Sequence, residues 1–328
     1  VVTANKALIS NYGDQLSKIA EKNHVNLEFE AAVCGGVPII RSLKESLIAK
    51  KINKVYGIVN GTSNYILSLM DKENKSFNEV LIKAQKLGYA ESNPTSDLSG
   101  EDVAAKLKIL SSLCFNSFLN KNIHVEGIKD IDKDDIKYAK KLGYKIKLLG
   151  YAELIGNHIY QRVHPTLIKK SSYVAGIDGV LNAVIVDGLP VGQSIIQGEG
   201  AGPAATTSAL ISDISSILRG NIKFPFSISN RERKKLNFKD ILDRTFSAYL
   251  RFEVKDQPGV LSNITQIFSK NNVSIKRLIQ NPKKNKGSSS IVIITHISKN
   301  KSLNKIIKTV NKRPYVLKKS KLIRIDDI

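Results

Sequence analysis

Four ionisable side chains that could do acid–base chemistry lie close together in the sequence, at Glu91, Asp97, Asp102 and Lys106. Asp102 and Lys106 are four positions apart, which places them on one face of a helix. The neighbouring positions on that face are apolar, so Lys106 is partly desolvated, which favours its neutral form, while Asp102 favours the charged form. This balance predicts a lysine that gives and takes a proton near neutral pH.

The chemistry that suits these groups is the reduction of an aldehyde. Hydride delivered to the carbonyl carbon leaves an alkoxide, and a lysine ammonium can supply both the positive charge and the proton that the alkoxide needs. Glu91 and Asp97 could hold a substrate ammonium. An ion pair at a helix start, with no catalytic role, has the same spacing. On the residues alone both interpretations stay open.

A helix over residues 100–114 must present this pair. Ser99 is placed to cap the helix, because small polar side chains favour the N-cap, and residues 89–99 are predicted to form the preceding loop. Lys108 and Ser112 are expected to face solvent. The pair would then lie near the start of a helix whose other face is apolar.

The rest of the chain up to residue 220 alternates between helical and extended patterns, which predicts an α/β (α+β) fold with a mixed sheet. Predicted helices cover residues 5–20, 39–50, 65–72, 77–87 and 204–218, and predicted strands cover residues 25–33, 55–59, 145–154, 158–165 and 182–186. Gly88 is expected to end the helix over residues 77–87 as its C-cap.

A polar linker is predicted over residues 221–244, and the pattern beyond it is compact. Predicted strands there cover residues 248–255, 274–280, 289–297 and 317–325, and predicted helices cover residues 259–271 and 303–311. This βαββαβ order within residues 245–328 is the ferredoxin-like arrangement.

The net charge of +22 and the isoelectric point of about 9.8 raise the question of nucleic-acid binding. The excess cations are mostly Lys, many of them in residues 245–328, and the chain has no Trp for base stacking. Abundant Lys, Ile and Asn together are what an AT-rich genome produces. A nucleic-acid-binding protein is therefore a minor alternative, and no nucleic-acid partner is expected.

The compartment and the metal content are inferred from composition. Only Cys34 and Cys114 are present, which suits a reducing compartment. No apolar run approaches the roughly 18 residues needed to cross a bilayer, and no signal peptide is recognisable. The histidines lack metal-ligand spacing. The sequence thus predicts a cytoplasmic protein with no membrane contact and no catalytic metal.

Several segments resemble homoserine dehydrogenases in residue type, spacing and order. The longest covers residues 84–106 and contains Gly88-Tyr89, Asn93-Pro94, Asp97-Leu98, Gly100-Glu101-Asp102 and Lys106, and the shorter ones lie at residues 2–6, 58–67, 162–168, 179–184 and 198–202. The likeness covers roughly residues 1–220. It implies an NAD(P)-dependent oxidoreductase that interconverts aspartate 4-semialdehyde and L-homoserine in the biosynthesis of threonine, methionine and isoleucine.

The resemblance also implies roles for single residues. Lys106 matches the proton donor and acceptor, and the substrate site is matched by Glu91, Asp97 and Asp102. Lys6 matches a lysine beside the reacting carbonyl, and the cofactor contacts are matched by Lys6, Gly88, Gly200 and Gly202. A structural sodium ion is expected at Glu30, Val33, Gly35 and Val37, and the chain is expected to form a homo-oligomer.

The fingerprint G-x-G-x-x-G, which places pyrophosphate at a helix N-terminus, does not occur in this sequence. Residues 1–38 are therefore expected to be the C-terminal remainder of a Rossmann-type dinucleotide-binding domain, with residues 198–220 packing back on it. Residues 39–220 are expected to form a mixed-sheet substrate and dimerisation domain. The choice between NAD and NADP stays open.

Residues 245–328 resemble an ACT domain, a small ligand-binding module of amino-acid metabolism. Asp256-Gln257-Pro258-Gly259 matches its strand-to-helix turn, where Asp256 and Gly259 are expected to bind the ligand because backbone N–H groups at a helix start can take a carboxylate. Threonine is the expected feedback inhibitor, and a structural or dimerising module is the alternative. For the chain as a whole, the alternative to an enzyme is a non-catalytic amino-acid sensor built around this domain.

Overall fold

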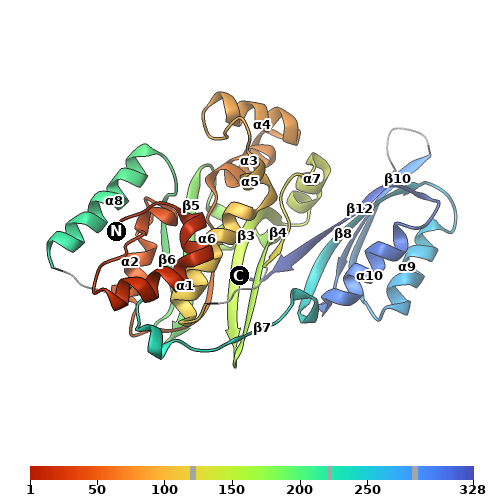
Figure 1. Ribbon diagram of the computed structural model, residues 1–328. Coiled ribbons are helices and arrows are strands. Elements are labelled where there is room, and N and C mark those ends of the chain that lie inside the picture. The colour runs from red at the N-terminus through yellow and green to blue at the C-terminus, as the bar shows by residue number, and fades with distance from the viewer. Residues whose placement is uncertain (119–122, 221–223, 283–286) are drawn as a thin grey trace.

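The computed structural model describes residues 1–118, 123–220, 224–282 and 287–328 (Figure 1). The α-helices in this part of the chain are α1 (Lys6–Lys22), α2 (Ile39–Arg41), α3 (Gly61–Glu73), α4 (Phe77–Lys86), α5 (Thr95–Ser99), α6 (Glu101–Phe115), α7 (Lys133–Lys141), α8 (Pro203–Leu218), α9 (Val260–Lys270) and α10 (Asn300–Val310). The strands are β1 (Lys51–Ile58), β2 (His124–Val125), β3 (Tyr144–Ile155), β4 (His158–Lys169), β5 (Leu181–Leu189), β6 (Gly192–Glu199), β7 (Asn237–Phe238), β8 (Thr245–Lys255), β9 (Ile275–Pro282), β10 (Ser288–Thr295), β11 (Ser298–Lys299) and β12 (Val316–Asp326). The predicted mixed α/β class is confirmed.

One mixed sheet runs through the molecule in the strand order β6-β5-β1-β3-β4-β12-β8-β10-β9. Its first and last parts meet where β12 pairs in parallel with β4, with Arg324 beside Thr166 and Asp326 beside Ile168. Figure 1 shows β12 running from the C-terminal helices to the central strands. The C-terminal part therefore does not stand apart behind a linker, because its last strand continues the sheet of the first part.

The antiparallel hairpin of β3 and β4 forms the middle of this sheet, with paired residues from Tyr144 and Lys169 onward. Gly150 on β3 leaves room for a helix: a Cβ there would lie 3.0 Å from a methyl carbon of Val103 on α6. Because no side chain separates them, α6 packs directly on the sheet. This close packing fixes the position from which α6 presents its polar side chains.

Helix α6 lies between α1 and the sheet and is buried on most of its surface (Figure 1). The prediction that Ser112 faces solvent is wrong, because the side chain is buried and its hydroxyl donates to the carbonyl of Lys108 at 2.8 Å. The prediction that Ser99 caps the helix is also wrong. The residue before α6 is Gly100, with φ +88°, and Ser99 is the last residue of α5, a helix that was predicted as loop. Two successive helices need a left-handed residue between them, and glycine adopts that conformation without strain.

The secondary structure predicted for the first 50 residues is only partly confirmed. Helix α1 confirms the predicted helix, but the strand predicted over residues 25–33 is wrong, because only a single parallel bridge joins Val2 to Glu28. The helix predicted over residues 39–50 is α2 followed by a π-helical turn, Ser42–Ser46. An extended segment with one buried face has the alternation of a strand even where no strand ladder forms.

Residues 224–244 pack against the protein and are not a free polar linker; residues 221–223 of the predicted linker lie outside the described residues. Phe226 is buried, with its ring centroid 5.0 Å from that of Phe29. Arg233 pairs with Asp14 of α1 at 3.1 Å. The segment therefore packs against α1 and the residues that follow it. Its basic composition gave no indication of the apolar contact between Phe226 and Phe29.

The βαββαβ order predicted for residues 245–328 is confirmed as β8, α9, β9, β10, α10 and β12, with the short β11 in addition. The two helices cover one face of these strands and enclose a separate apolar core that includes Leu250, Phe252, Ile264, Phe268 and Leu303. Residues 283–286, a Lys-rich segment that the sequence leads us to expect in solvent, lie outside the described residues.

Buried charges cross the junction between the two parts of the sheet. Arg162 on β4 pairs with Asp326 on β12 at 2.8 Å, and Arg251 on β8 pairs with Asp135 on α7 at 2.7 Å. His164 lies in the same layer, and burial together with the neighbouring arginines lowers its pKa to about 3. The junction is thus a polar, fully packed interface, and the two parts cannot separate without exposing or unpairing these groups.

Candidate active site

Helix α6 places Asp102 and Lys106 one turn apart on the wall of a cavity. The ammonium of Lys106 lies 2.8 Å from Oδ2 of Asp102, and it also donates to the carbonyl oxygen of Val59 at 2.8 Å, just after β1. The side chains of Asp102 and Lys106 are only 5% and 11% exposed. The ion pair is therefore buried and fixed by a third group, unlike a pair at an exposed helix start.

A second ammonium reaches the same carboxylate from α1. Nζ of Lys6 lies 3.0 Å from Oδ1 of Asp102, so the two carboxylate oxygens each face a different lysine. Lys6 is 42% exposed and Lys106 is nearly buried. The site therefore has one cation at the cavity mouth and one at its wall, both oriented by Asp102.

The electrostatic surroundings keep this pair ionised. Burial raises the pKa of Asp102, but the charge of Lys106, the hydrogen bond from Asn60 and the charge of Lys6 outweigh it, so the pKa is lowered overall. Burial lowers the pKa of Lys106, and the charge of Asp102 outweighs this, so that pKa is raised above 10.5. The prediction that Lys106 titrates near neutral pH is wrong. The raised pKa favours the ammonium form of Lys106, which can donate a proton.

The two remaining carboxylates lie on the same cavity. Helix α5 carries Asp97, whose Oδ1 accepts a hydrogen bond from Nδ2 of Asn60 at 2.8 Å and whose backbone carbonyl accepts one from the hydroxyl of Ser63 at 2.7 Å. Glu91 lies in the segment between α4 and α5 and is exposed. Two carboxylates near a lysine ammonium suit a substrate that carries both a positive group and a reacting oxygen.

This cavity has a volume of about 520 Å³ and brings together residues from distant parts of the sequence. The predicted site residues that line it are Lys6, Gly88, Glu91, Asp97, Asp102, Lys106, Gly200 and Gly202. Asn60 and Thr62 also line it; they belong to the segment 58–67 that resembles the family, where residues 60–64 are expected to form a turn that shapes the substrate pocket. Further lining residues, to which the sequence assigned no role, are Tyr89, Asn182 and Glu199. Asn60, Gly61 and Thr62 are turn-forming residue types, whereas Asn182 lies in an apolar strand, where the sequence pattern gives no indication of a site.

The glycines predicted to lie in the site, Gly88, Gly200 and Gly202, differ in what a side chain would meet. Gly88 (φ +76°) and Gly202 (φ +111°) have no atom within 4 Å of an added Cβ, so the space beside them is open. At Gly200 a Cβ would lie 2.0 Å from Nδ2 of Asn182. Packing of Asn182 explains the glycine at 200, whereas the open space beside Gly88 and Gly202 allows a ligand to approach the backbone.

The residues expected to hold sodium lie on one turn next to the cavity, where the N–H of Gly35 donates to the carbonyl of Gly200 at 3.1 Å. Both carboxylate oxygens of Glu30 accept backbone N–H groups, from Ile40 at 2.9 Å and Arg41 at 2.7 Å. Burial is the main reason that the pKa of Glu30 is raised to about 7. The carboxylate is therefore already occupied, and in the described residues no cluster of three or more His, Cys, Asp or Glu could hold a metal.

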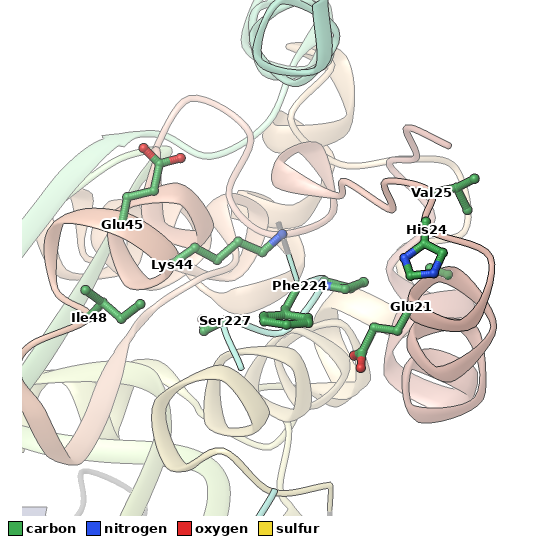
Figure 2. Close-up of a pocket in the computed structure, with 10 residues that line it drawn as sticks. Glu21, His24, Val25, Lys44, Glu45, Ile48, Phe224 and Ser227 are labelled. Atoms are coloured by element: carbon green, nitrogen blue, oxygen red, sulfur yellow. The ribbon is translucent and has the colours of Figure 1, made fainter. Parts of the chain in front are cut away.

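A different pocket, of about 330 Å³, lies between the end of α1 and the π-helical turn (Figure 2). Figure 2 shows Glu21 and His24 on one side, Glu45 and Ile48 on the other, and Lys44 extending toward Phe224. Lys44 is already paired with Glu28 at 2.8 Å, and no residue with a predicted role lines this pocket. It carries none of the chemistry described above.

A third pocket lies at the turn between β8 and α9. The segment from Val254 to Leu261 lines it together with Gln280 and Ile291, and it includes the predicted ligand residues Asp256 and Gly259. Gly259 has φ +86° and precedes the first residue of α9. The N–H of Asp256 donates to the carbonyl of Gly287 at 2.9 Å, so the first part of the turn is held in place.

Comparisons with known proteins show which family the chain is similar to. A sequence profile described as homoserine dehydrogenase matches residues 38–215, and one described as ACT domain matches residues 248–314. A homoserine dehydrogenase from Neisseria gonorrhoeae is 41% identical over 100% of this chain and 77% of the relative. The chain belongs to the homoserine dehydrogenase family. A homoserine dehydrogenase from Bacillus subtilis is 38% identical over 95% of this chain and 72% of the relative.

Solved structures of homoserine dehydrogenases share the fold. That from Thiobacillus denitrificans has a TM-score of 0.92 at 38% identity, over 100% of this chain and 76% of that chain. A hyperthermophilic archaeal homoserine dehydrogenase in complex with NADPH has a TM-score of 0.60 at 27% identity, over 68% of this chain and 65% of that chain. Homoserine dehydrogenases are NAD(P)-dependent oxidoreductases that interconvert aspartate 4-semialdehyde and L-homoserine. The alternative of a non-catalytic sensor is therefore wrong, and the ACT domain fits regulation.

Proposed function

We propose that Lys106 donates the proton when aspartate 4-semialdehyde is reduced, and accepts it when L-homoserine is oxidised. The single observation that carries this proposal is the buried ammonium of Lys106 on the cavity wall, held by Asp102 and by the carbonyl of Val59. Bound NAD(P)H supplies the hydride. The oxygen of the former carbonyl then takes a proton from Lys106, and Lys6 adds positive charge near the developing alkoxide.

Asp102 acts in this proposal through the two lysines. Its oxygens already accept from Lys6, Lys106 and Asn60, so its main contribution is to hold both ammonium groups toward the reacting oxygen. Glu91 and Asp97 bind the ammonium of the amino acid. The distance between the cation-binding and anion-stabilising ends of the cavity then selects a short amino acid with an oxygen on its side chain.

The open cavity beside Gly88 and Gly202 fits the nicotinamide end of NADP or NAD, with Lys6 alongside and Gly200 supporting the turn. Residues 1–38 and 198–220 form part of the dinucleotide-binding domain, and we place its phosphate-binding part outside these 328 residues. Exposed apolar side chains on α1 and α8 are the surface that such a part would cover: Leu8, Tyr12, Ile19, Ile211, Ile214 and Leu218. Residues 39–220 form the substrate domain, through which the chain forms a homo-oligomer.

A structural sodium ion would be bound near the cavity by backbone carbonyl oxygens of the turn from Glu30 to Val37, because carbonyl oxygens suit a hard cation. The carboxylate of Glu30 takes no part, since two backbone N–H groups already occupy it. The ion would hold Val33 and Gly35 in the conformation that supports the turn at Gly200.

Threonine is the proposed feedback inhibitor, bound at the turn that contains Asp256 and Gly259. This pocket lies at a helix start with its backbone held by the neighbouring hairpin, an arrangement suited to an amino-acid carboxylate.

No helix in the described ranges is long and apolar enough to cross a membrane. We place the enzyme in the cytoplasm, where its substrate and cofactor are available.

The experiment that tests this function is the homoserine-dependent reduction of NADP and of NAD, measured with the protein at the length of its relatives. Lys106→Met is compared with Lys108→Met, a lysine on the same helix that does not line the cavity. The proposal expects the Lys106 variant to lose about 10²- to 10⁴-fold in kcat and the Lys108 variant to remain active. Equal rates for the two variants would remove Lys106 from the mechanism.

A further inference from the structure

Asn60 links the two carboxylates of the site. It is buried between β1 and α3, and its Nδ2 donates to Oδ1 of Asp97 at 2.8 Å and to Oδ2 of Asp102 at 2.9 Å. One amide group thus uses both of its hydrogens on carboxylates from two different helices, α5 and α6. Neither the turn-forming preference of asparagine nor the proton transfer described above requires this arrangement.

The orientation of this amide is determined by the backbone. Asn60 is the N-cap of α3, and its Oδ1 accepts the backbone N–H of Ser63 at 2.8 Å. If the amide were rotated by 180°, its NH₂ group would face that N–H, and its oxygen would face two carboxylates. The helix cap therefore forces the NH₂ group toward Asp97 and Asp102.

The position of Asn60 counters a repulsion that the site would otherwise contain. Asp97 and Asp102 lie on opposite sides of one NH₂ group, so their oxygens are close enough for like charges to raise the free energy of the ionised pair. The hydrogen bond from Asn60 contributes to the lowered pKa of Asp102. Oδ2 of Asp102, which binds Asn60, is also the oxygen that binds Lys106. Movement of this oxygen would therefore shift the proton donor.

We propose that Asn60 is a positioning residue of the reaction, which fixes Asp102 against Lys106 and orients Asp97 for the substrate ammonium. This inference rests on the proposed function, because Asn60 acts only through those groups. The charged and titratable groups that face Lys106 are Asp102 on α6, Asp97 on α5, Lys6 on α1 and Cys34 on the neighbouring turn. Asn60 is in direct contact with the first two.

Two substitutions separate the amide donor from the helix cap. Asn60→Ser keeps an oxygen that can cap α3 and removes the NH₂ group, whereas Asn60→Asp keeps the cap and adds a third negative charge beside Asp97 and Asp102. Ser76→Ala is the control for a lost cap, since Ser76 caps α4 by the same type of hydrogen bond and lies outside the cavity. It should lower Tm and leave the pH profile unchanged.

The full-length enzyme is assayed for kcat, KM and the pH dependence of kcat/KM in the NADPH-dependent reduction of aspartate 4-semialdehyde, the direction in which Lys106 must be protonated. Asn60→Ser should lose about tenfold or more in kcat/KM, as expected when a charge-assisted hydrogen bond is lost. Its acidic limb should move to higher pH, because the pKa of Asp102 rises without the amide donor. For Asn60→Asp, both limbs should move to higher pH, because added negative charge raises the pKa of Asp102 and of Lys106 alike.

The outcome that overturns the inference is an active wild-type enzyme in which Asn60→Ser keeps kcat/KM within threefold and the same acidic limb. A lower Tm with unchanged kinetics would also reject it, because Asn60 would then only cap α3. Failure of the proposed function looks different: the wild type would show no homoserine-dependent activity, or Lys106→Met would remain as active as the wild type.

Discussion

Lys6 and Lys106 meet on opposite oxygens of a single carboxylate, at 3.0 Å and 2.8 Å from Asp102, although 100 positions separate the two lysines in the sequence. Asp102 is 5% exposed, so these ion pairs are formed where water screens them little. Their arrangement explains how a lysine on the inner face of a helix stays charged. The first prediction concerns this carboxylate.

Asp102→Asn should lower the pKa of Lys106, because burial then acts without the opposing charge. In the reduction direction Lys106 must be protonated, so activity is lost as the pH rises through its pKa. The alkaline limb of kcat/KM for reduction should therefore move to lower pH, and the rate at neutral pH should fall. The pH profile of the variant is measured against Glu101→Gln, an exposed acidic residue on the same helix. An alkaline limb in the wild-type position would contradict the role given to Asp102.

The junction between β4 and β12 should depend on one buried ion pair. Asp326→Asn leaves the guanidinium of Arg162, which is 4% exposed, without its partner, and should cost about 3–5 kcal/mol of unfolding free energy. Asp327→Asn is the matched control: the pair of Asp327 with Lys169 is exposed, so its loss should leave the unfolding free energy nearly unchanged. Urea unfolding measures both. Equal stabilities of the two variants would show that the buried pair does not hold the junction.

His164 should make stability fall in acid. Its pKa in the folded protein, about 3, lies below the ordinary value of 6.5, so the unfolded chain binds more protons between these values. The stability that neutral His164 provides is complete above pH 6.5 and is lost as the pH falls toward 3. Within this window the group should contribute a slope of about 1.4 kcal/mol per pH unit.

The measurement for His164 is the unfolding free energy of the wild type and of His164→Gln at several pH values between 4 and 7. The difference between the two proteins should shrink as the pH falls, because only the wild type must bury a neutral imidazole. His158→Gln, on the same strand and half-buried, serves as the control. Parallel curves for wild type and His164→Gln would be inconsistent with the burial-driven shift.

Much of this architecture follows from local sequence patterns. Helix α6 and its Asp102–Lys106 pair follow from i,i+4 spacing, and the βαββαβ order follows from alternating strand and helix patterns. Asn60 illustrates the limit, because its donors meet carboxylates that lie 37 and 42 positions later. The local sequence around Asn60 indicates a turn, but it does not indicate which distant carboxylates the amide of Asn60 will contact.

Two kinds of error had physical causes that only the folded chain reveals. Ser99 was a reasonable helix cap, but the chain turns at Gly100, where only a residue tolerant of positive φ joins α5 to α6. The charge state of Lys106 depended on a balance between burial and Asp102. The balance favours the ammonium because Nζ of Lys106 lies 2.8 Å from the carboxylate of Asp102. Asp97 and Cys34 also raise the pKa of Lys106. Likewise, pairing of β12 with β4 is a contact between distant segments, which no local pattern encodes.

Regulation is predicted to act through the turn at Gly259. Threonine should bind the full chain in calorimetry at millimolar concentration, and Gly259→Val should abolish the heat, since φ +86° strongly disfavours a β-branched residue and the turn would deform. Gly143→Val provides a comparison at another left-handed glycine, which has the same φ of +86° and lies outside the pocket lining. The absence of heat with the wild-type protein would exclude threonine as the ligand of this pocket.

The most direct measurement of the central claim is chemical rescue of Lys106→Ala. Removal of the side chain leaves a space beside Asp102 and the carbonyl of Val59, both of which can bind a small ammonium ion. The rate of NADPH-dependent reduction of aspartate 4-semialdehyde by this variant should be about 10²- to 10⁴-fold below the wild type. It should then rise with added methylammonium and saturate. A variant rate within threefold of the wild type, unchanged by the amine, would contradict proton donation by Lys106.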